Sequence, residues 1–287
     1  MKIRSATLEY QGQVFTFTSK PVFGATGAWV LEDVTGWYGG VGVRAETTDR
    51  LGHGMFQQRA WRSNRALTLA ATYIANDPDE RLALQRALSG MLWAGDYGTL
   101  TVETDRVLSC PVRLDGEPGI VELGTHGVQL QVPLVSMDPW LYGEDRVTYL
   151  YPQGTGVGLE YPLFTSEAVS DGVLAYGSAI DTNDRITNGG NAVAYPTYLV
   201  VGDFPGGVTI AVSGGSITFP WPISENAPLR VDTSGSAWIG GTNVTTRLTS
   251  RAFSKFAIKP GSTTAPKVTA LQGGEGFVEM HISDTFI

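Results

Sequence analysis

Alternation of apolar and polar residues dominates the first half of the chain and predicts short β-strands. From Arg65 to Tyr73 the apolar residues fall at every second position, as they do in a half-buried strand. Other apolar runs, bounded by glycines and polar turns, predict four more strands: Leu8 to Tyr10, Val14 to Phe17, Trp29 to Leu31 and Trp37 to Val43. We expect residues 52–58, Gly-His-Gly-Met-Phe-Gln-Gln, to form a loop.

The pattern predicts one helix, over residues 78–93. Asp77 can cap the free amides, Pro78 fits the first helical position, and Glu80 completes an Asp-x-x-Glu variant of the capping box. Gly95 ends the pattern. The apolar residues at helical spacing form a stripe that we expect to pack onto a sheet: Leu84, Leu88, Met91 and Leu92.

Two hairpins are predicted after the helix. Residues 100–102 pair with 108–114, and residues 120–123 lead through a glycine-bounded turn into 128–135. The last of these strands alternates apolar residues with glutamines, which is typical of an antiparallel sheet with one solvated face. The segment Ser136-Met-Asp-Pro-Trp-Leu-Tyr142 closes the unit.

A second all-β unit is predicted to follow. Charge, Tyr, Pro and Gly are mixed between Gly143 and Leu163, so we place a domain boundary near residue 150, with domains 1–150 and 151–287. Many short strands suggest a sandwich or jelly roll: Thr197 to Val201, Val208 to Val212, Ser216 to Phe219, Leu229 to Asp232, Phe253 to Ile258, Lys267 to Leu271 and Phe277 to Ile282. Ser213-Gly-Gly215 makes a tight hairpin between two of them.

Composition agrees with a mainly β protein. The 287 residues suffice for two ordinary domains, and 36 Gly and 15 Pro with only 17% charged residues favour a turn-rich fold. The net charge is −8, with 12 basic and 17 acidic residues in 1–145 and 8 and 11 in the rest. Neither half has the basic excess that grips a phosphate backbone. A negative channel surface would instead let DNA slide past without sticking.

Cys110 is the single cysteine, so the chain can form neither an intrachain disulfide nor a cysteine-based metal site. It lies on the apolar side of a predicted strand and is expected in the core. The first residues have no apolar signal-peptide segment, and no run of about 18 apolar residues occurs. We therefore expect neither classical export nor membrane insertion.

The histidines offer no readable catalytic site. His53 lies between two glycines in the expected loop, but no Ser or Cys nucleophile with a base and an orienting group can be read nearby. His126 falls in a tight turn and His281 in a terminal strand. All three are interpreted as surface or structural residues.

Two other segments resemble ligand sites only superficially. Asp181 to Asp184 offers oxygen ligands but lacks the Gly and distant Glu of an EF-hand loop, so a polar turn is the better interpretation. Gly154 to Gly158 lacks the Lys and the strand and helix context of a phosphate loop and is interpreted as a linker. We predict no catalytic, cofactor-binding or metal-binding residues and no cofactor.

Two aromatic features leave alternatives open. Arg59, Arg62 and Arg65 with Trp61 form the densest basic and aromatic cluster, which suits either an interface with phosphate or a carboxylate-bearing neighbour, or a solvated edge. Trp221, in Phe-Pro-Trp-Pro, could stack on a sugar ring, although a Trp buried inside a sandwich is commoner.

The order of these elements resembles a known family. Short strands, one Asp-Pro-capped helix, a long hairpin and the Ser136 to Tyr142 close are similar to the N-terminal domain of the distal tail proteins (Dit-like minor tail proteins) of long-tailed, non-contractile bacteriophages. The second half is similar to the galectin-like sandwich of that family in four stretches: Asn188 to Pro196, Thr197 to Val201, Leu229 to Asp232 and Phe256 to Gly261. The resemblance covers nearly the whole chain but rests on architectural motifs.

The resemblance implies a structural virion component that is not an enzyme. Members form a six-fold ring at the tip of the tail tube, with N-terminal domains around a central channel and C-terminal domains pointing outward. They join the tail tube to the tip hub and to receptor-binding proteins, and DNA only passes through the channel. The resemblance thus places this chain at the tail tip of a virion, assembled in the host cytoplasm. A closed ring would also cover the exposed strand edges of such a β domain.

Two other functions stay open. One is a carbohydrate-binding module that recognises a host cell-surface glycan through residues 151–287. Larger family members carry an inserted carbohydrate-binding module, and 287 residues leave no room for one. The other is a glycan-cleaving tail enzyme, which would need two carboxylates converging in a cleft.

Overall fold

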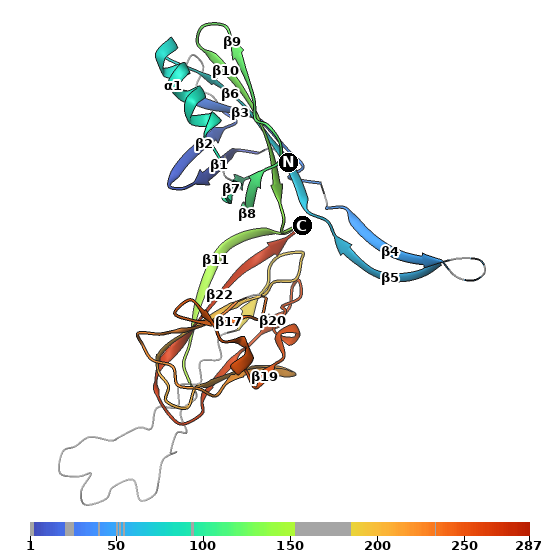
Figure 1. Cartoon of the computed structure of the whole chain (residues 1–287), viewed down its shortest axis with the longest axis vertical. Helices are drawn as coiled ribbons and strands as arrows, with labels where there is room; N and C mark the ends of the chain where they lie inside the picture. The colour runs from blue at the N-terminus through green and yellow to red at the C-terminus, as the bar shows by residue number, and fades with distance from the viewer. Residues whose placement is uncertain are drawn as a thin grey trace, which may run out of the picture. The chain divides into compact units, whose positions relative to one another are not determined.

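The structure is a computed structural model of the chain that describes residues 3–20, 26–39, 41–49, 51, 53, 55–92, 95–152, 185–232 and 234–287. The described residues are mainly β with one α-helix, which confirms the predicted fold class (Figure 1). The chain divides into two compact units, Met1–Glu144 with Phe286–Ile287, and Asp145–Thr285. We call these unit 1 and unit 2. None of the helices in the described part of the chain is long and apolar enough to cross a membrane.

Unit 1 is built on a sheet that closes on itself. Its strands follow the order β8, β7, β1, β2, β3, β6, β10, and β10 pairs again with β8 through Leu134 and Val135. β2 and β3 are parallel, and the other neighbours in this ring of strands are antiparallel. β9 extends the sheet beyond β10 as a hairpin. The bounds are β1 Ser5–Tyr10, β2 Gln13–Thr18, β3 Ala28–Thr35, β6 Arg65–Ile74, β7 Gly98–Glu103, β8 Val107–Leu114, β9 Gly119–Leu123 and β10 Gly127–Ser136.

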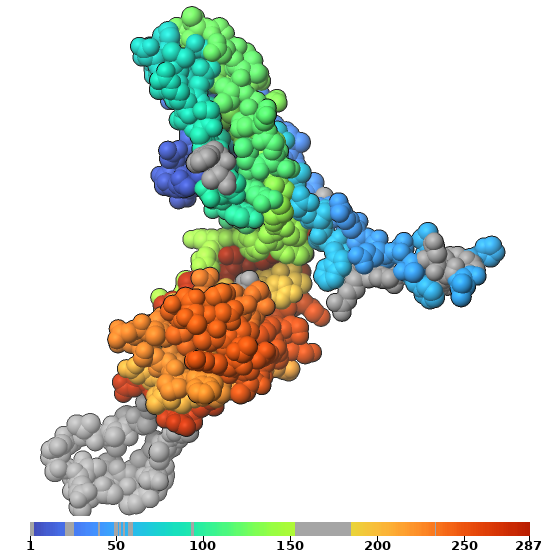
Figure 2. All heavy atoms as spheres, in the orientation of Figure 1, coloured from blue at the N-terminus to red at the C-terminus, as the bar shows by residue number. Residues whose placement is uncertain are grey.

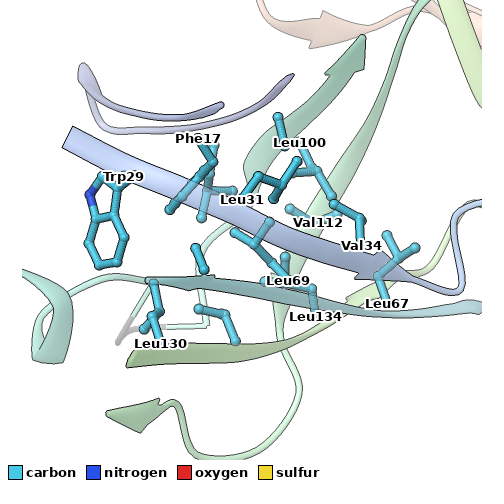
Figure 3. Packing of buried hydrophobic residues seen from close by; sticks show 14 of the residues in the cluster. Phe17, Trp29, Leu31, Val34, Leu67, Leu69, Leu100, Val112, Leu130 and Leu134 are labelled. Carbon is cyan, nitrogen blue, oxygen red and sulfur yellow. The ribbon is translucent and has the colours of Figure 1, made fainter. Parts of the chain in front are cut away.

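The core of unit 1 follows the alternation that the sequence shows. In β6 and in the middle of β10 the apolar positions are buried at every second residue and the intervening positions are exposed or partly exposed, whereas Gly127 and Val135 near the ends of β10 are buried as well. Figure 3 shows side chains from β3, β6 and β10 meeting in one cluster with residues of neighbouring strands. Cys110 is buried in this cluster, as predicted. The labelled members of the cluster are Phe17, Trp29, Leu31, Val34, Leu67, Leu69, Leu100, Val112, Leu130 and Leu134.

The helix of unit 1, α1 (Pro78–Ser89), begins where the sequence predicts but ends earlier. Asp77 Oδ1 accepts a hydrogen bond from the Glu80 amide at 2.7 Å, which confirms the N-cap. The predicted end near residue 93 is wrong. Gly90 follows the helix, and Leu92 has a φ of 54°, a left-handed conformation that a helix cannot contain. Leu92 is nevertheless buried in the core, which explains why its apolar character prolonged the pattern.

Unit 2 contains two sheets that enclose a second core. One has the order β18, β17, β16, β13, β22 and the other β19, β15, β14, β21, while β12 pairs with β20. Buried residues of both sheets form one cluster. The bounds are β11 Leu141–Leu150, which begins in unit 1, β12 Ile186–Thr187, β13 Thr197–Asp203, β14 Val208–Val212, β15 Gly215–Phe219, β16 Leu229–Val231, β17 Ala237–Ile239, β18 Thr242–Asn243, β19 Ser250–Arg251, β20 Thr263–Thr264, β21 Lys267–Ala270 and β22 Glu275–Phe286.

Three predicted elements are wrong. Trp37 to Val43 is a strand only at Val43, because Trp37 is buried in a loop whose carbonyls bond to a side chain. Residues 55–58 are not loop but part of a strand, β5 (Met55–Arg62), which pairs with β4 (Val43–Asp49). Phe253 to Ile258 begins as a 3₁₀ turn, since the amides of Lys255 and Phe256 bond back to carbonyls three residues earlier.

Candidate assembly site: the β4–β5 arm

Unit 1 carries an exposed two-stranded arm. β4 (Val43–Asp49) and β5 (Met55–Arg62) form a sheet of two strands, and within the described residues neither pairs with a third strand. Figure 1 shows these two strands leaving the rest of unit 1 as a narrow ribbon. We call residues 43–62 the arm. A hairpin of two strands is marginally stable on its own in water, so such an element needs a partner surface.

The arm carries apolar side chains without a core to bury them. Val43 is 59% exposed, Met55 58% and Trp61 58%, and residues 43–48 are exposed on both faces of the strand. In the space-filling view the body of unit 1 does not cover the visible face of the arm (Figure 2). Exposed apolar patches on soluble proteins mark interaction sites, and unpaired strand edges invite pairing with another chain.

The root of the arm is fixed by a buried arginine, Arg65. Its guanidinium Nη1 donates to the carbonyls of Gly36, Trp37 and Gly39 at 3.1 to 3.2 Å, and its Nε and Nη2 donate to the carbonyl of Pro139 at 3.2 and 3.0 Å. Burial lowers the pKa of Arg65 from its ordinary value. The side chain therefore ties the loop before the arm to the turn that follows β10, while starting β6 itself.

Gly36 is a position where only glycine fits. Its φ is +85°, and a Cβ there would lie 2.2 Å from the Ala66 carbonyl oxygen. The chain at Gly36 therefore packs directly against the start of β6 at the root of the arm. The Gly36 carbonyl also accepts a hydrogen bond from Arg65. The two ends of the arm are also joined by a hydrogen bond, which the Ser63 amide donates to the Gly42 carbonyl at 2.9 Å.

The Ser136 to Tyr142 close is the second anchor of the root. Asp138 accepts hydrogen bonds from the Trp140 amide at 3.2 Å and from the Tyr142 hydroxyl, and Ser136 Oγ donates to the Asp138 carbonyl at 2.7 Å. Burial and the Asp138 hydrogen bond raise the pKa of Tyr142. The guanidinium carbon of Arg62 lies 5.7 Å from the centre of the Trp140 ring, so the last residue of the arm stacks on this turn.

Charge distinguishes the arm from the rest of unit 1. Residues 43–62 contain four arginines against one Glu and one Asp, whereas the remainder of residues 1–144 contains 8 basic and 14 acidic residues. The arm is thus positive and the body that carries it negative.

The predicted basic and aromatic cluster belongs partly to the arm and partly to the core. Trp61 and Arg62 lie on β5 and are exposed. Arg65 is 2% exposed and serves the root, so it is not an edge residue. The side chain of Arg59 lies outside the described residues. The interface interpretation left open for this cluster therefore concerns Trp61 and Arg62.

The three histidines occupy unrelated places. His53 lies exposed between the strands of the arm, and His126 is exposed in the turn before β10. His281 on β22 contacts Asp145 at 2.8 Å and Glu279 at 3.4 Å. The hydrogen bond with Asp145 is the main cause that raises the pKa of His281. The structure does not bring the three histidines together.

The remaining predicted features lie on the surface or outside the described residues. Trp221 is 49% exposed, with the Arg247 guanidinium carbon 5.5 Å from its ring centre, so the expectation of a buried sandwich Trp is wrong. Pro220 and Pro222 on either side of it are exposed too, so this short segment lies on the surface. The polar turn Asp181 to Asp184 and the linker Gly154 to Gly158 both lie outside the described residues.

A hollow of about 750 Å³ beside β1 and β2 contains two carboxylates, Glu103 and Asp105. Glu103 forms an ion pair with Arg4 at 3.5 Å. A hydrogen bond from Thr104 lowers the pKa of Asp105, the opposite of what a catalytic acid of a glycosidase needs. Among the described residues no group of three or more His, Cys, Asp or Glu side chains could hold a metal ion.

One feature of the sequence indicates the arm, although the arm does not show the alternation of apolar and polar residues. Apolar, basic and other polar residues are mixed on both sides of Gly52-His-Gly54, which suits a hairpin with two solvated faces, where apolar and polar residues do not alternate. The pattern of buried positions finds only strands that contribute to a core.

No known family model and no curated protein matches this sequence. Solved structures do match it. The SPP1 Dit protein, described as a paradigm of the hub adsorption apparatus in phages that infect Gram-positive bacteria, superposes with a TM-score of 0.62 at 14% identity, over 98% of this chain and 99% of that one.

Chains of the phage P2 baseplate in its activated conformation also match. With Ca the TM-score is 0.52 at 10% identity, over 99% of this chain and 98% of that one. With Sr it is 0.52 at 11% identity, over 98% of both. These likenesses cover both units, and this chain therefore has the fold of the phage distal tail proteins, as its sequence resemblance predicts.

Proposed function

We propose that this protein is a structural virion component, a distal tail protein that forms a hexameric ring at the tail tip. In this role it connects the tail tube to the tip hub and to receptor-binding proteins. Two observations support the proposal. The fold matches phage hub and baseplate proteins over the whole chain, and unit 1 projects an arm whose apolar side chains are exposed.

The arm is the observation that carries the proposal. A hairpin with Val43, Met55 and Trp61 exposed gains stability when a neighbour covers it, at roughly 25 cal/mol for each Å² of apolar surface buried. In a cyclic assembly the arm of each copy docks on the body of the next, so the same contact repeats until the ring closes. Positive arm and negative body favour this head-to-tail arrangement over arm-to-arm contact.

The rigid root gives the docked arm a defined direction. Arg65, Gly36 and the Ser136 to Tyr142 turn fix both ends of the arm to β6 and β10. A ring of defined size needs each neighbour at the same angle, which a freely hinged arm could not provide. Six copies, with unit 1 around a central channel through which DNA passes, is the arrangement that the family resemblance implies. We also propose assembly in the host cytoplasm before incorporation into the virion.

The mass of the purified protein tests the arm. We expect light scattering coupled to size exclusion to give about six times the chain mass of 30.7 kDa at high concentration, with a shift towards it as concentration rises. Trp61→Asp should reduce this association at least tenfold, because it places a charge on the docking surface, while the circular dichroism stays unchanged.

The matched control is Trp221→Asp, since Trp221 in unit 2 is also exposed, at 49% against 58% for Trp61. It should leave the association of the wild type intact. A protein that stays monomeric at every concentration and binds cell-wall polysaccharide would refute the ring in favour of a carbohydrate-binding module. Equal association of the wild type and Trp61→Asp would show that the arm does not form the interface.

A further inference from the structure

Strand β9 has an open edge in the part of unit 1 that the structure describes. Each strand of the closed ring of strands in unit 1 has two neighbours, whereas β9 pairs with β10 alone. Proteins normally cover or charge such an edge, because its free amides and carbonyls can pair with another chain. The edge of β9 therefore offers a place where a further strand can join the sheet.

Exposed apolar side chains lie beside this edge. Val121 is 54% exposed and Leu123 46%, and alternation along β9 places both on the same side of the strand. In the register of the sheet Leu123 lies opposite Gly127, and Gly127 lies opposite Ile74, which is 45% exposed. We call Val121, Leu123 and Ile74 the edge patch. Exposed apolar patches of this kind mark interaction surfaces.

Helix α1 holds β9 in position without covering the edge patch. Glu122 Oε1 forms an ion pair with Arg81 at 2.8 Å and accepts a hydrogen bond from Gln85 at 3.2 Å. The hydrogen bonds from Arg81 and Gln85 lower the pKa of Glu122, which keeps its carboxylate charged. Alternation places Glu122 on the other side of β9 from Val121, so these contacts leave the patch exposed. A strand that is fixed in advance pays less entropy when a partner pairs with it.

Strand β5 of the arm has the complementary character. It carries the exposed side chains of Met55, Phe56 and Trp61, and it contains two arginines and no carboxylate. Residues 114–125, which include β9, contain three carboxylates and no Lys or Arg. Opposite charges favour the encounter of these two elements, and burial of their apolar side chains stabilises the contact.

One copy of the chain cannot join these two elements to each other. Figure 1 shows the arm and β9 at opposite ends of unit 1. A contact between them is therefore a contact between two copies. Because it joins two different surfaces, the contact repeats head to tail, as a closed ring of copies requires.

We propose that β5 of one copy pairs with the open edge of β9 in the next copy, where the apolar side chains of the arm cover the edge patch. This inference rests on the ring proposed above and names the surface that receives the arm. β5 is the joining strand rather than β4, because β4 contains Glu46 and Asp49, which the acidic residues around β9 repel.

A thiol crosslink tests this pairing, because the native Cys110 is buried and leaves only introduced thiols reactive. Ala60→Cys on β5 is combined with Val121→Cys on β9 in one chain and treated with a short bismaleimide. We expect a ladder of covalent dimers and higher multiples on a denaturing gel. Ala60→Cys with Val14→Cys is the matched control, since Val14 on β2 is 59% exposed, and it should give no ladder.

A charge at the edge patch gives a second measurement that needs no crosslink. Val121→Lys places a positive charge where the positive arm binds, so association measured by light scattering should weaken about tenfold. Val14→Lys adds the same charge away from β9 and should leave association unchanged. Equal weakening by the two variants would overturn pairing at β9.

The results distinguish this inference from the ring itself. A wild type that associates, with no more crosslinking in the Ala60 and Val121 pair than in the Ala60 and Val14 pair, would overturn the pairing at β9 and leave the ring in place. A wild type that stays monomeric at every concentration would overturn both.

Discussion

Arg65 shows how one residue can fix the direction of a projecting element. Four backbone carbonyls converge on its buried guanidinium. Arg65→Met keeps the length of the side chain but leaves these carbonyls without a donor, so we expect a loss of roughly 3 kcal/mol of stability, measured by urea unfolding. Arg44→Met, on the exposed arm, is the control and should change stability by less than about 0.5 kcal/mol. Equal losses in the two variants would contradict the role given to Arg65.

Burial suppresses the reactivity of the Cys110 thiol. Burial raises the pKa of its thiol to about 12, so little thiolate exists in the folded protein at pH 9. We expect iodoacetamide to leave native protein unmodified at this pH and to react rapidly in urea. Because the folded pKa is the higher one, this thiol's contribution to stability is complete below the unfolded pKa and declines as pH rises from about 9 towards 12. Native and unfolded protein reacting at the same rate would show that Cys110 is accessible.

At the scale of the element, helix α1 follows directly from local chemistry. Asp77→Ala removes the acceptor of the Glu80 amide and should cost about 1 kcal/mol of stability, measured by thermal or urea unfolding. Asp79→Ala is the matched control, because Asp79 lies in the first turn without capping and only its interaction with the helix dipole, about 0.3 kcal/mol, is lost. A larger effect at Asp79 than at Asp77 would contradict the assigned cap.

The elements that the sequence predicts well are those that bury one face locally. β6, β10 and the start of α1 follow from alternation or capping, because both signals are written in consecutive residues even where the paired strand, such as β3 or β10 for β6, is distant in sequence. The arm was missed, since exposure of both its faces erases the period of two. At Trp37 the error is the opposite, because an apolar residue predicted a strand where there is a loop. The Trp37 side chain enters the core from this loop, whose carbonyls accept hydrogen bonds from Arg65 instead of from a neighbouring strand. Here hydrogen bonds from the Arg65 side chain replace those of a neighbouring strand, and this depends on residues far apart in sequence.

At the scale of the whole molecule, two units with different surfaces suit an adaptor. Unit 1 has the closed sheet and the arm, which supply self-association in our proposal. Unit 2 has a sandwich of two sheets with Trp221 and Tyr195 on its surface. The likeness to phage hub and baseplate proteins extends over both, at 98% or more of this chain. Alternation and turn chemistry predict this two-part β organisation, whereas the ring itself depends on contacts between copies.

The central claim, a place at the tail tip, is tested most directly by electron microscopy of virions labelled with a gold-conjugated antibody against this chain. The account predicts label confined to the distal end of the tail tube, around its axis. Label on the capsid, along the tube or on no part of the virion would contradict it.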